Sequence, residues 1–146
     1  VGILTRGGIS SGLLHHSKGI MYGEGFISAY RLEQQSAIYP RVVVSNKILE
    51  KNSDALLPWL SLDPDGVYYI NLFKFDAVAG DPDELAADGY DPRAIYFKVV
   101  RDELIKNRKI STEESHLVKQ QWMIDKFNKA VIDFNRKALE KVELID

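Results

Sequence analysis

The 146-residue chain contains no cysteine. Disulfide bonds, thiolate metal sites and thiol catalysis are therefore excluded within it, and the composition fits a reducing, cytoplasmic compartment. The chain also lacks an excess of positive charge, since 19 Lys and Arg residues stand against 21 Asp and Glu residues, for a net charge of −2. Because the chain has no net positive charge to attract phosphate groups, we expect no nucleic acid among its partners.

Long hydrophobic runs are missing as well. No apolar stretch approaches the roughly twenty residues that cross a bilayer, and no signal-peptide pattern is present, so we expect no membrane partner. What is there is an ordinary globular composition, with 45% hydrophobic and 27% charged residues. Length and composition fit one domain with a buried core, and we predict a single domain over residues 1–146.

The stretch Gly19–Glu33 combines a strand, a glycine step and a helix. Ile20–Tyr22 is the predicted strand and Gly23–Gly25 is the glycine step. The helix that follows has an expected apolar face of Phe26, Ala29, Tyr30 and Ala37, with Arg31 off that face. Two interpretations are open. Backbone N–H groups and Arg31 could bind a phosphate, or the stretch is an ordinary strand–helix connection with a solvated arginine.

The segment before this stretch is predicted to be a strand and a hairpin. Ile3–Ser10 forms the strand, in which Gly7-Gly8 would be costly unless another backbone or a ligand comes close. The chain then continues outward to His15-His16, expected at an exposed loop tip, and returns along Ile20–Tyr22. Adjacent strand residues point to opposite faces, so the two histidines are a poor chelating pair.

Short elements follow the first helix, which proline ends near Tyr39-Pro40. β-Branched runs indicate strands, side-chain caps indicate helix starts, and Asp-Pro-Asp-Gly indicates a turn. In order, we expect a buried strand at Val42–Ser45, helices at Lys47–Lys51 and from Ser53-Asp54 to Leu57, a turn at Asp63–Gly66 and a strand at Val67–Phe75.

The remaining sequence predicts an acidic loop and two helices. Asp76–Asp91 lacks the spacing of a helix–loop–helix calcium site, so a solvated surface loop is the favoured interpretation. Asp91-Pro92 starts a helix whose inward residues we expect to be Ile95, Val99 and Leu104. Ser111–Glu114 resembles a capping box for a last helix that runs to about Val142. Its expected apolar stripe is Met123, Phe127, Ala130, Val131, Phe134 and Ala138.

Several motifs, in this order and spacing, resemble the later half of a class III nucleotidyl cyclase domain. They are Thr5–Gly12, Tyr22-Gly23, Ala29–Glu33 and Pro40–Ser45. The tail, from Asp65-Gly66 to Lys119, Trp122-Met123 and Lys126–Asn128, is similar to that of compact bacterial members, some of which resemble the pyrimidine cyclases of antiphage signalling.

This resemblance implies an α/β fold of the α+β kind: the later half of a ferredoxin-like βαββαβ core, with added C-terminal helices. It also implies a head-to-tail homodimer that converts a nucleoside triphosphate into a 3′,5′-cyclic nucleotide and pyrophosphate for second-messenger signalling. Two Mg²⁺ or Mn²⁺ ions would assist the reaction. Their aspartate ligands are expected before Val1, with none in this chain, so we expect the chain alone to be inactive. By position, Arg31 would stabilise the charge that builds on the α-phosphate.

Two positions depart from the family pattern. Ile27 stands where an asparagine usually orients the ribose, and Ile20 stands where purine cyclases carry a polar residue that reads the base. Neither isoleucine can form these hydrogen bonds. Tyr22 and Gly23 complete the substrate-binding set, while the family's lysine for the terminal phosphates has no clear counterpart. The departures fit either an enzyme of divergent base specificity or a catalytically inactive, nucleotide-binding or dimerising module.

Overall fold

The computed structural model describes residues 5–74, 91–110, 112–136, 138 and 140–146. It is a mixed α/β structure, which agrees with the predicted class. The described residues fall into two compact units, one formed by Leu4–Leu72 and the other mainly by Phe73–Asp146. That the whole chain belongs to one domain stays a prediction.

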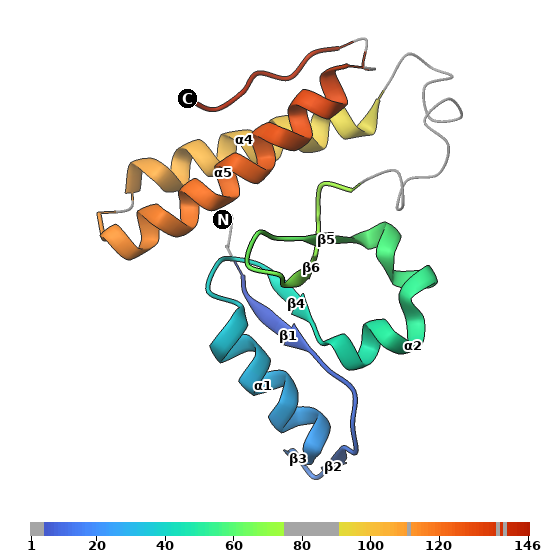
Figure 1. The fold of residues 1–146 in the computed structure, drawn as a ribbon. Coiled ribbons are helices and arrows are strands. Elements are labelled where there is room, and N and C mark those ends of the chain that lie inside the picture. The colour runs from blue at the N-terminus through green and yellow to red at the C-terminus, as the bar shows by residue number, and fades with distance from the viewer. Residues whose placement is uncertain (1–4, 75–90, 111, 137, 139) are drawn as a thin grey trace. The chain divides into compact units, whose positions relative to one another are not determined.

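The first unit contains a four-stranded sheet with the order β1-β4-β6-β5 (Figure 1). β1 (Gly7–Ile9) pairs in parallel with β4 (Val42–Val44), and β6 (Tyr68–Ile70) pairs antiparallel with β4 and with β5 (Leu60–Leu62). β4 lies inside the sheet, and Val43 in it is fully buried. Its β-branched sequence suits that position, because such side chains pack well on a pleated surface.

The predicted hairpin is present, but it is formed by β2 (His15–Ser17) and β3 (Ile20–Tyr22). Lys18 and Gly19 connect the two strands with φ angles of 48° and 79°. Positive φ at both central residues matches the type I′ turn that suits strand twist. The two histidines are exposed, as expected, yet they lie in a paired strand, and the tip is Lys18-Gly19 instead.

Helix α1 (Glu24–Ser36) packs on β1 and β4. A Cβ atom on Gly8 would lie 2.3 Å from the carbonyl oxygen of Ala29. The expectation that another backbone approaches the glycine pair is therefore confirmed at Gly8. The predicted helix face is only partly correct, since Phe26 and Tyr30 are 43% and 59% exposed while Ala37 is buried. Close packing against Gly8 brings the small Ala29 side of the helix toward the sheet and leaves the aromatic flank outside.

Helix α2 (Asn46–Leu56) spans the two short helices that the sequence predicted. Asn52 has a non-helical φ of −140°, which marks the break between them. A 3₁₀ turn, η1 (Leu57–Trp59), leads into β5, a strand that the sequence did not predict because three residues are too few to show alternation. The turn at Asp63–Gly66 is confirmed, with Gly66 at a φ of 78°, and β6 is shorter than its prediction.

The second unit is built on α4 (Pro92–Ile110) and α5 (Glu114–Asn135), which pack through an aromatic core. The ring of Phe97 lies 5.9 Å from that of Phe127 and 5.1 Å from that of Phe134. The described part of the predicted stripe on α5 contributes to this packing, although the most buried residues also include Gln120 and Ile124.

The predicted start of α4 is confirmed, because the Asp91 carboxylate accepts a hydrogen bond from the Arg93 backbone N–H at 2.9 Å. Leu104 faces inward as predicted, whereas Ile95 and Val99 are 43% and 58% exposed. The inward face is centred on Ala94 and Phe97 instead, because the large aromatic ring of Phe97 fills the space toward α5.

Both predicted ends of α5 differ from the structure. The N-cap is Glu113 and its side chain forms no capping hydrogen bond, so the predicted capping box, which would begin at Ser111, is wrong. The helix ends at Asn135 and not near Val142, and residues 140–146, which we name the C-terminal segment, form neither a helix nor a strand. The predicted acidic loop, apart from Asp91, lies outside the described residues.

Candidate functional site

Arg31 and Ile27 lie one turn apart on α1. Helical spacing places them opposite the Ala29 side of the helix that packs on the sheet. Ile27 is 47% exposed, and Arg31 is exposed without an ion pair or hydrogen bond to another described residue. A free guanidinium of this kind is available to bind an anion with its planar set of donors.

Ile20 and Tyr22 belong to β3 of the hairpin that precedes α1. They are 64% and 57% exposed, and the Tyr22 ring lies 4.7 Å from the ring of His15 on β2. This contact covers only one side of the tyrosine. Each of these predicted binding residues is therefore accessible to a partner molecule.

The glycine step joins the hairpin to the helix through close backbone packing. Gly23 has a φ of 135°, and a Cβ atom there would lie 2.4 Å from the carbonyl oxygen of Leu13. The same carbonyl accepts a hydrogen bond from the Gly25 N–H at 3.0 Å, and Gly12 lies against Gly25. The Gly25 N–H is thus already paired, so a phosphate at this step would have to use other donors.

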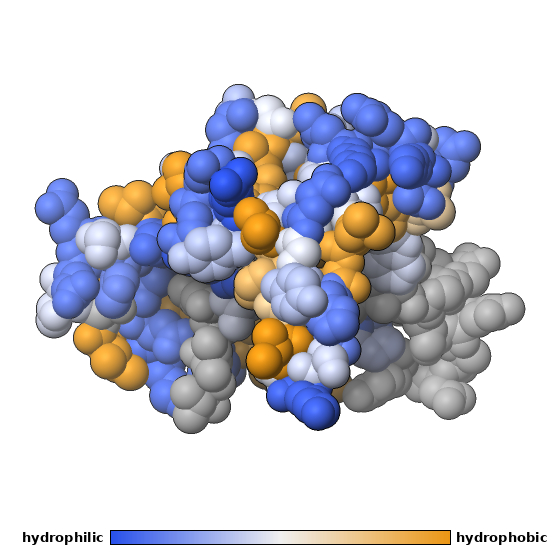
Figure 2. Space-filling model, turned by 90° about the horizontal axis from the view of Figure 1, so that it is seen from below, coloured by the Kyte–Doolittle hydropathy of each residue, from blue (hydrophilic) through white to orange (hydrophobic). Residues whose placement is uncertain are grey.

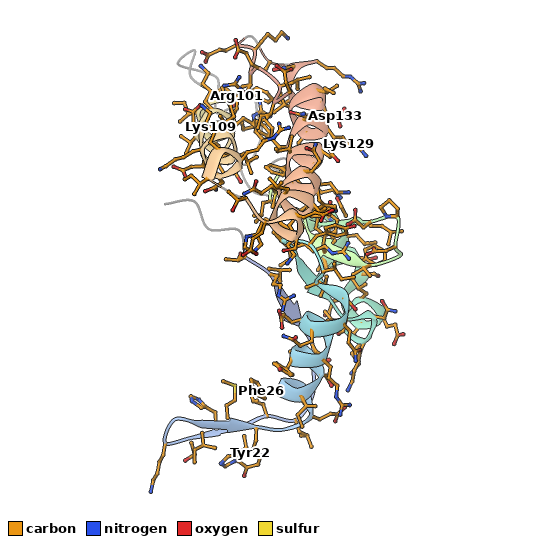
Figure 3. The ribbon with its side chains drawn as sticks, turned by 90° about the vertical axis from the view of Figure 1, so that its left-hand side faces the viewer. Tyr22, Phe26, Arg101, Lys109, Lys129 and Asp133 are labelled. Carbon is orange, nitrogen blue, oxygen red and sulfur yellow. The ribbon has the colours of Figure 1, made fainter. Side chains whose placement is uncertain are left out.

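Exposed apolar side chains are concentrated around the hairpin and the outer side of α1. Figure 3 shows Tyr22 on the hairpin and Phe26 at the adjoining start of the helix, and hydrophobic residues reach the surface seen in Figure 2. The set comprises Leu13, Leu14, Ile20, Met21, Tyr22, Phe26, Ile27, Tyr30 and Ile38, which are 43% to 82% exposed. Large apolar side chains that are exposed on neighbouring elements favour an interaction site.

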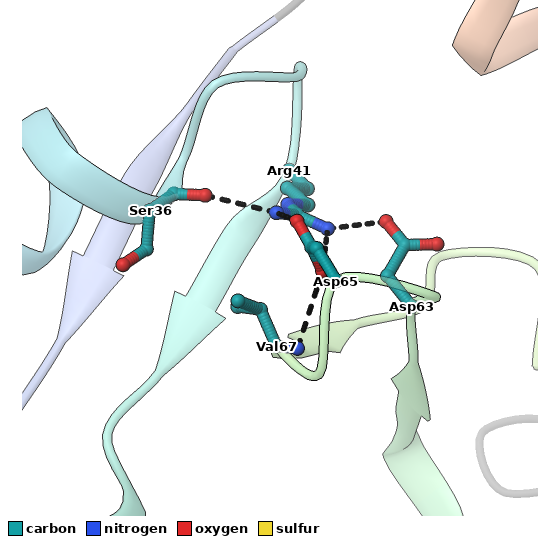
Figure 4. Close-up of polar contacts among 5 residues, drawn as sticks. All are labelled: Ser36, Arg41, Asp63, Asp65 and Val67. Atoms are coloured by element: carbon teal, nitrogen blue, oxygen red, sulfur yellow. Dashed lines mark hydrogen bonds and ion pairs between the residues drawn. The ribbon is translucent and has the colours of Figure 1, made fainter.

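A buried charge cluster lies elsewhere in the first unit (Figure 4). The guanidinium of Arg41, just before β4, forms ion pairs with Asp63 and Asp65 in the β5–β6 turn, and its Nη2 donates to the Ser36 carbonyl at 2.9 Å. The side chains of Arg41 and Asp63 are 0% and 2% exposed. The cluster ties the end of α1 and the start of β4 to the turn, which is a structural role.

The electrostatics of this cluster favour its charged form. Burial by itself lowers the pKa of Arg41, but the hydrogen bond and charge of Asp65, together with Asp63, outweigh it and raise that pKa. The hydrogen bond from Arg41 lowers the pKa of Asp65 against the opposing effect of burial. The sequence marks Asp63–Gly66 only as a turn, because no local signal indicates an ion pair between residues 22 positions apart.

Among the described residues, no group of three or more His, Asp or Glu side chains could hold a metal ion. The cyclase resemblance places the ligands of its two divalent ions before Val1, and that expectation stays a prediction. The described helices also include none that is long and apolar enough to cross a membrane.

No family model, no curated protein and no solved structure matches this chain.

Proposed function

We propose that this chain is the later half of a nucleotidyl cyclase homology domain, with a ferredoxin-like core, that acts in a homodimer on a nucleoside triphosphate. The observation that supports this most is the arrangement at α1. A glycine-bearing strand, a hairpin and a glycine-led helix occur in the order of the family motifs. The helix presents Arg31 one turn after Ile27, and Arg31 is exposed and has no partner among the described residues.

In this proposal, Arg31 binds the triphosphate and stabilises negative charge on the α-phosphate as the ribose 3′-hydroxyl attacks and pyrophosphate leaves. Ile27 and Ile20 give the ribose and base an apolar surface, so selectivity rests on shape and on groups outside them. Divalent ions would supply charge neutralisation and activation of the hydroxyl, but no described residue of this chain is assigned to them.

The homodimer is supported by the exposed apolar surface around the hairpin. Leu13 is 82% exposed and Ile20 is 64% exposed, although both are large apolar side chains. Burying such surface is favourable at about 25 cal/mol per Å². Leu13→Asp should therefore weaken self-association in sedimentation equilibrium, and an unchanged mass distribution would remove this support.

The decisive experiment incubates the protein, with any residues that precede Val1 in its natural form, with each of the four nucleoside triphosphates and Mn²⁺. Release of pyrophosphate and a cyclic nucleotide from one of them is expected. If none of the four triphosphates gives a product, the proposal that the protein is a nucleotidyl cyclase is rejected.

Arg31→Ala should lower turnover by at least about one to two orders of magnitude, because it removes a donor that stabilises the transition state. The control is Arg136→Ala, because Arg136 is also exposed and forms its ion pair with Asp133, a near neighbour on the same helix end. Equal turnover in the two variants would reject the role of Arg31.

The alternative function is a catalytically inactive module that binds nucleotide or dimerises. It is favoured by the apolar, exposed side chains of Ile20 and Ile27, which offer no hydrogen bond to a ribose or base. Nucleotide binding without pyrophosphate release would support this alternative over the enzyme.

A further inference from the structure

Two asparagines of α5 hold the backbone of the C-terminal segment. The Asn128 side chain donates to the Ile145 carbonyl at 2.8 Å and accepts from the Ile145 N–H at 2.9 Å. Asn135 forms the same pair of bonds with Val142, at 2.8 and 2.9 Å. Bonds of this kind recognise extended backbone and do not depend on the side chain of the residue that is held.

The distance between the two asparagines along the helix equals the distance between the two residues that they bind along an extended chain. Asn128 and Asn135 are seven residues apart, which is about 10 Å along an α-helix. Val142 and Ile145 are three residues apart, which is about 9–10 Å along an extended or polyproline-like chain. The segment therefore runs antiparallel to α5 (Figure 1) and turns both aliphatic residues inward, to 4% and 7% exposure.

Acidic residues recur with the same period of three and meet basic residues of α4. Glu140 pairs with Lys98, and Glu143 pairs with Arg101 at 2.8 Å. The two glutamate side chains are 62% and 84% exposed. Exposed pairs contribute only about 0–1 kcal/mol each. They therefore select the register of the segment on α4 but add little to the stability of its binding.

The segment leaves space beside its end. A hollow of about 390 Å³ is lined by Arg101, Arg108 and Lys109 of α4, by the apolar Ile105, and by Leu144 to Asp146 of the segment. Figure 3 shows Arg101 and Lys109 on the same helix. The buried Nε atom of Arg101 has no hydrogen-bond acceptor among the described residues. Arg101 pairs with Glu143, and Arg108 donates a hydrogen bond to the Asp146 carbonyl oxygen, so the segment supplies the acceptors for this basic face.

The local sequence opposes the conformation that the segment adopts. Residues 136–142 read RKALEKV, and all but the final valine are strong helix formers. The helical pattern of α5 continues to about Val142, yet the helix ends at Asn135. A released segment would therefore gain helical structure. This gain lowers the free energy that is needed to detach the segment from α4 and α5.

From these contacts we propose that the α4–α5 surface is a recognition site for an extended acidic–aliphatic peptide, filled here by the chain's own C-terminal segment. The pattern it accepts is acidic, any, aliphatic, acidic, any, aliphatic. Asn128 and Asn135 read the backbone, the inward positions take the aliphatic residues, and the basic face of α4 selects the acidic ones. This site is independent of the cyclase function.

The test uses a fluorescent peptide of residues 140–146 and the full chain carrying Val142→Ser and Ile145→Ser, which weakens the internal occupant. The peptide should bind this variant at least about a hundredfold more tightly than it binds the unaltered chain, where the tethered segment competes at high effective concentration. A peptide with serine at both aliphatic positions should bind neither chain. Adding Asn128→Ala should abolish binding, whereas Gln121→Ala, a matched amide truncation on the same helix, should not.

A second measurement uses the unaltered chain, so that the proposal can be tested even if the variants do not fold. Millimolar peptide is added to the unaltered chain, and the side-chain amide resonances of Asn128 and Asn135 are followed by NMR. Their exchange broadening or shift is the expected result. If the amides stay unchanged and no folded variant binds the peptide, the segment is a fixed part of the fold and the proposal is overturned.

Discussion

The two units use charge in opposite ways. In the first, Arg41 and Asp63 are withdrawn from water and joined to Asp65. In the second, Lys98 and Arg101 meet Glu140 and Glu143 at the surface. A buried ion pair is costly to break because one charge is left without water or partner, whereas an exposed pair is replaced by hydration. The comparison separates charges that fix the fold from charges that can exchange partners.

Arg41→Met should show the largest effect on stability. The substitution leaves the Asp63 carboxylate buried without its cation, and we expect a loss of about 3–5 kcal/mol in the free energy of unfolding. Urea denaturation at neutral pH measures it.

The matched control for this substitution is the double variant Arg41→Met with Asp63→Leu, which removes both buried charges. It should be more stable than the single variant, since no buried charge remains unpaired. A double variant that loses as much as the sum of two single substitutions would contradict the assignment.

Asn128→Ala should have the next largest effect. It removes both side-chain partners of the Ile145 backbone, and partly buried hydrogen bonds of this kind contribute about 0.5–1.5 kcal/mol each. We expect a loss of about 1–3 kcal/mol and faster hydrogen exchange at the Ile145 amide. Gln121→Ala on the same helix should leave that amide unaffected.

Acid should weaken the buried cluster by a smaller amount. The pKa of Asp65 is lowered in the folded chain, so its stabilisation is present above its unfolded pKa of about 3.8 and is lost as pH falls through the folded pKa. Because 42% of the side chain is exposed, we expect below about 1 kcal/mol. Urea midpoints between pH 5 and pH 2 should fall less steeply for Asp65→Asn than for the unaltered chain.

Lys98→Gln should have the smallest effect. It breaks the exposed pair with Glu140, and the free energy of unfolding should change by about 0.5 kcal/mol or less. A loss comparable with that of Arg41→Met would remove the distinction between the two kinds of charge.

Part of the local structure followed from the sequence because its causes are local. Lys18-Gly19 forms the hairpin turn through backbone freedom, Asp91 caps α4 through its own side chain, and β-branched residues form β4. The glycine at position 8 also correctly indicated the close approach of another backbone. The turn and the cap depend on the residues themselves and on their neighbours along the chain, whereas Gly8 marks a contact with residues of α1 that are distant in the sequence.

The predictions that were wrong depend on distant contacts. Phe26 and Tyr30 looked like a core face, but the approach of α1 to Gly8 left them outside. α5 was expected to reach Val142, yet the helix ends at Asn135, and the side chains of Asn128 and Asn135 bond to the backbone of Ile145 and Val142. Ile95 and Val99 have the spacing of an inward face, while the aromatic packing of Phe97 decided the rotation of α4.

The features of the candidate site can likewise be divided into those that the sequence determines and those that depend on tertiary contacts. The sequence by itself determined the order of the motifs, the spacing of Ile27 and Arg31 on one helix, and the absence of cysteine chemistry, since each depends only on residue types and their period. Only the tertiary structure decided that Arg31 has no partner within the part of the chain that is described, that the Gly25 N–H is already paired with Leu13, and that Arg41 is neutralised within the fold. Those outcomes depend on which distant groups compete for the same donor, and a sequence pattern carries no information about that competition.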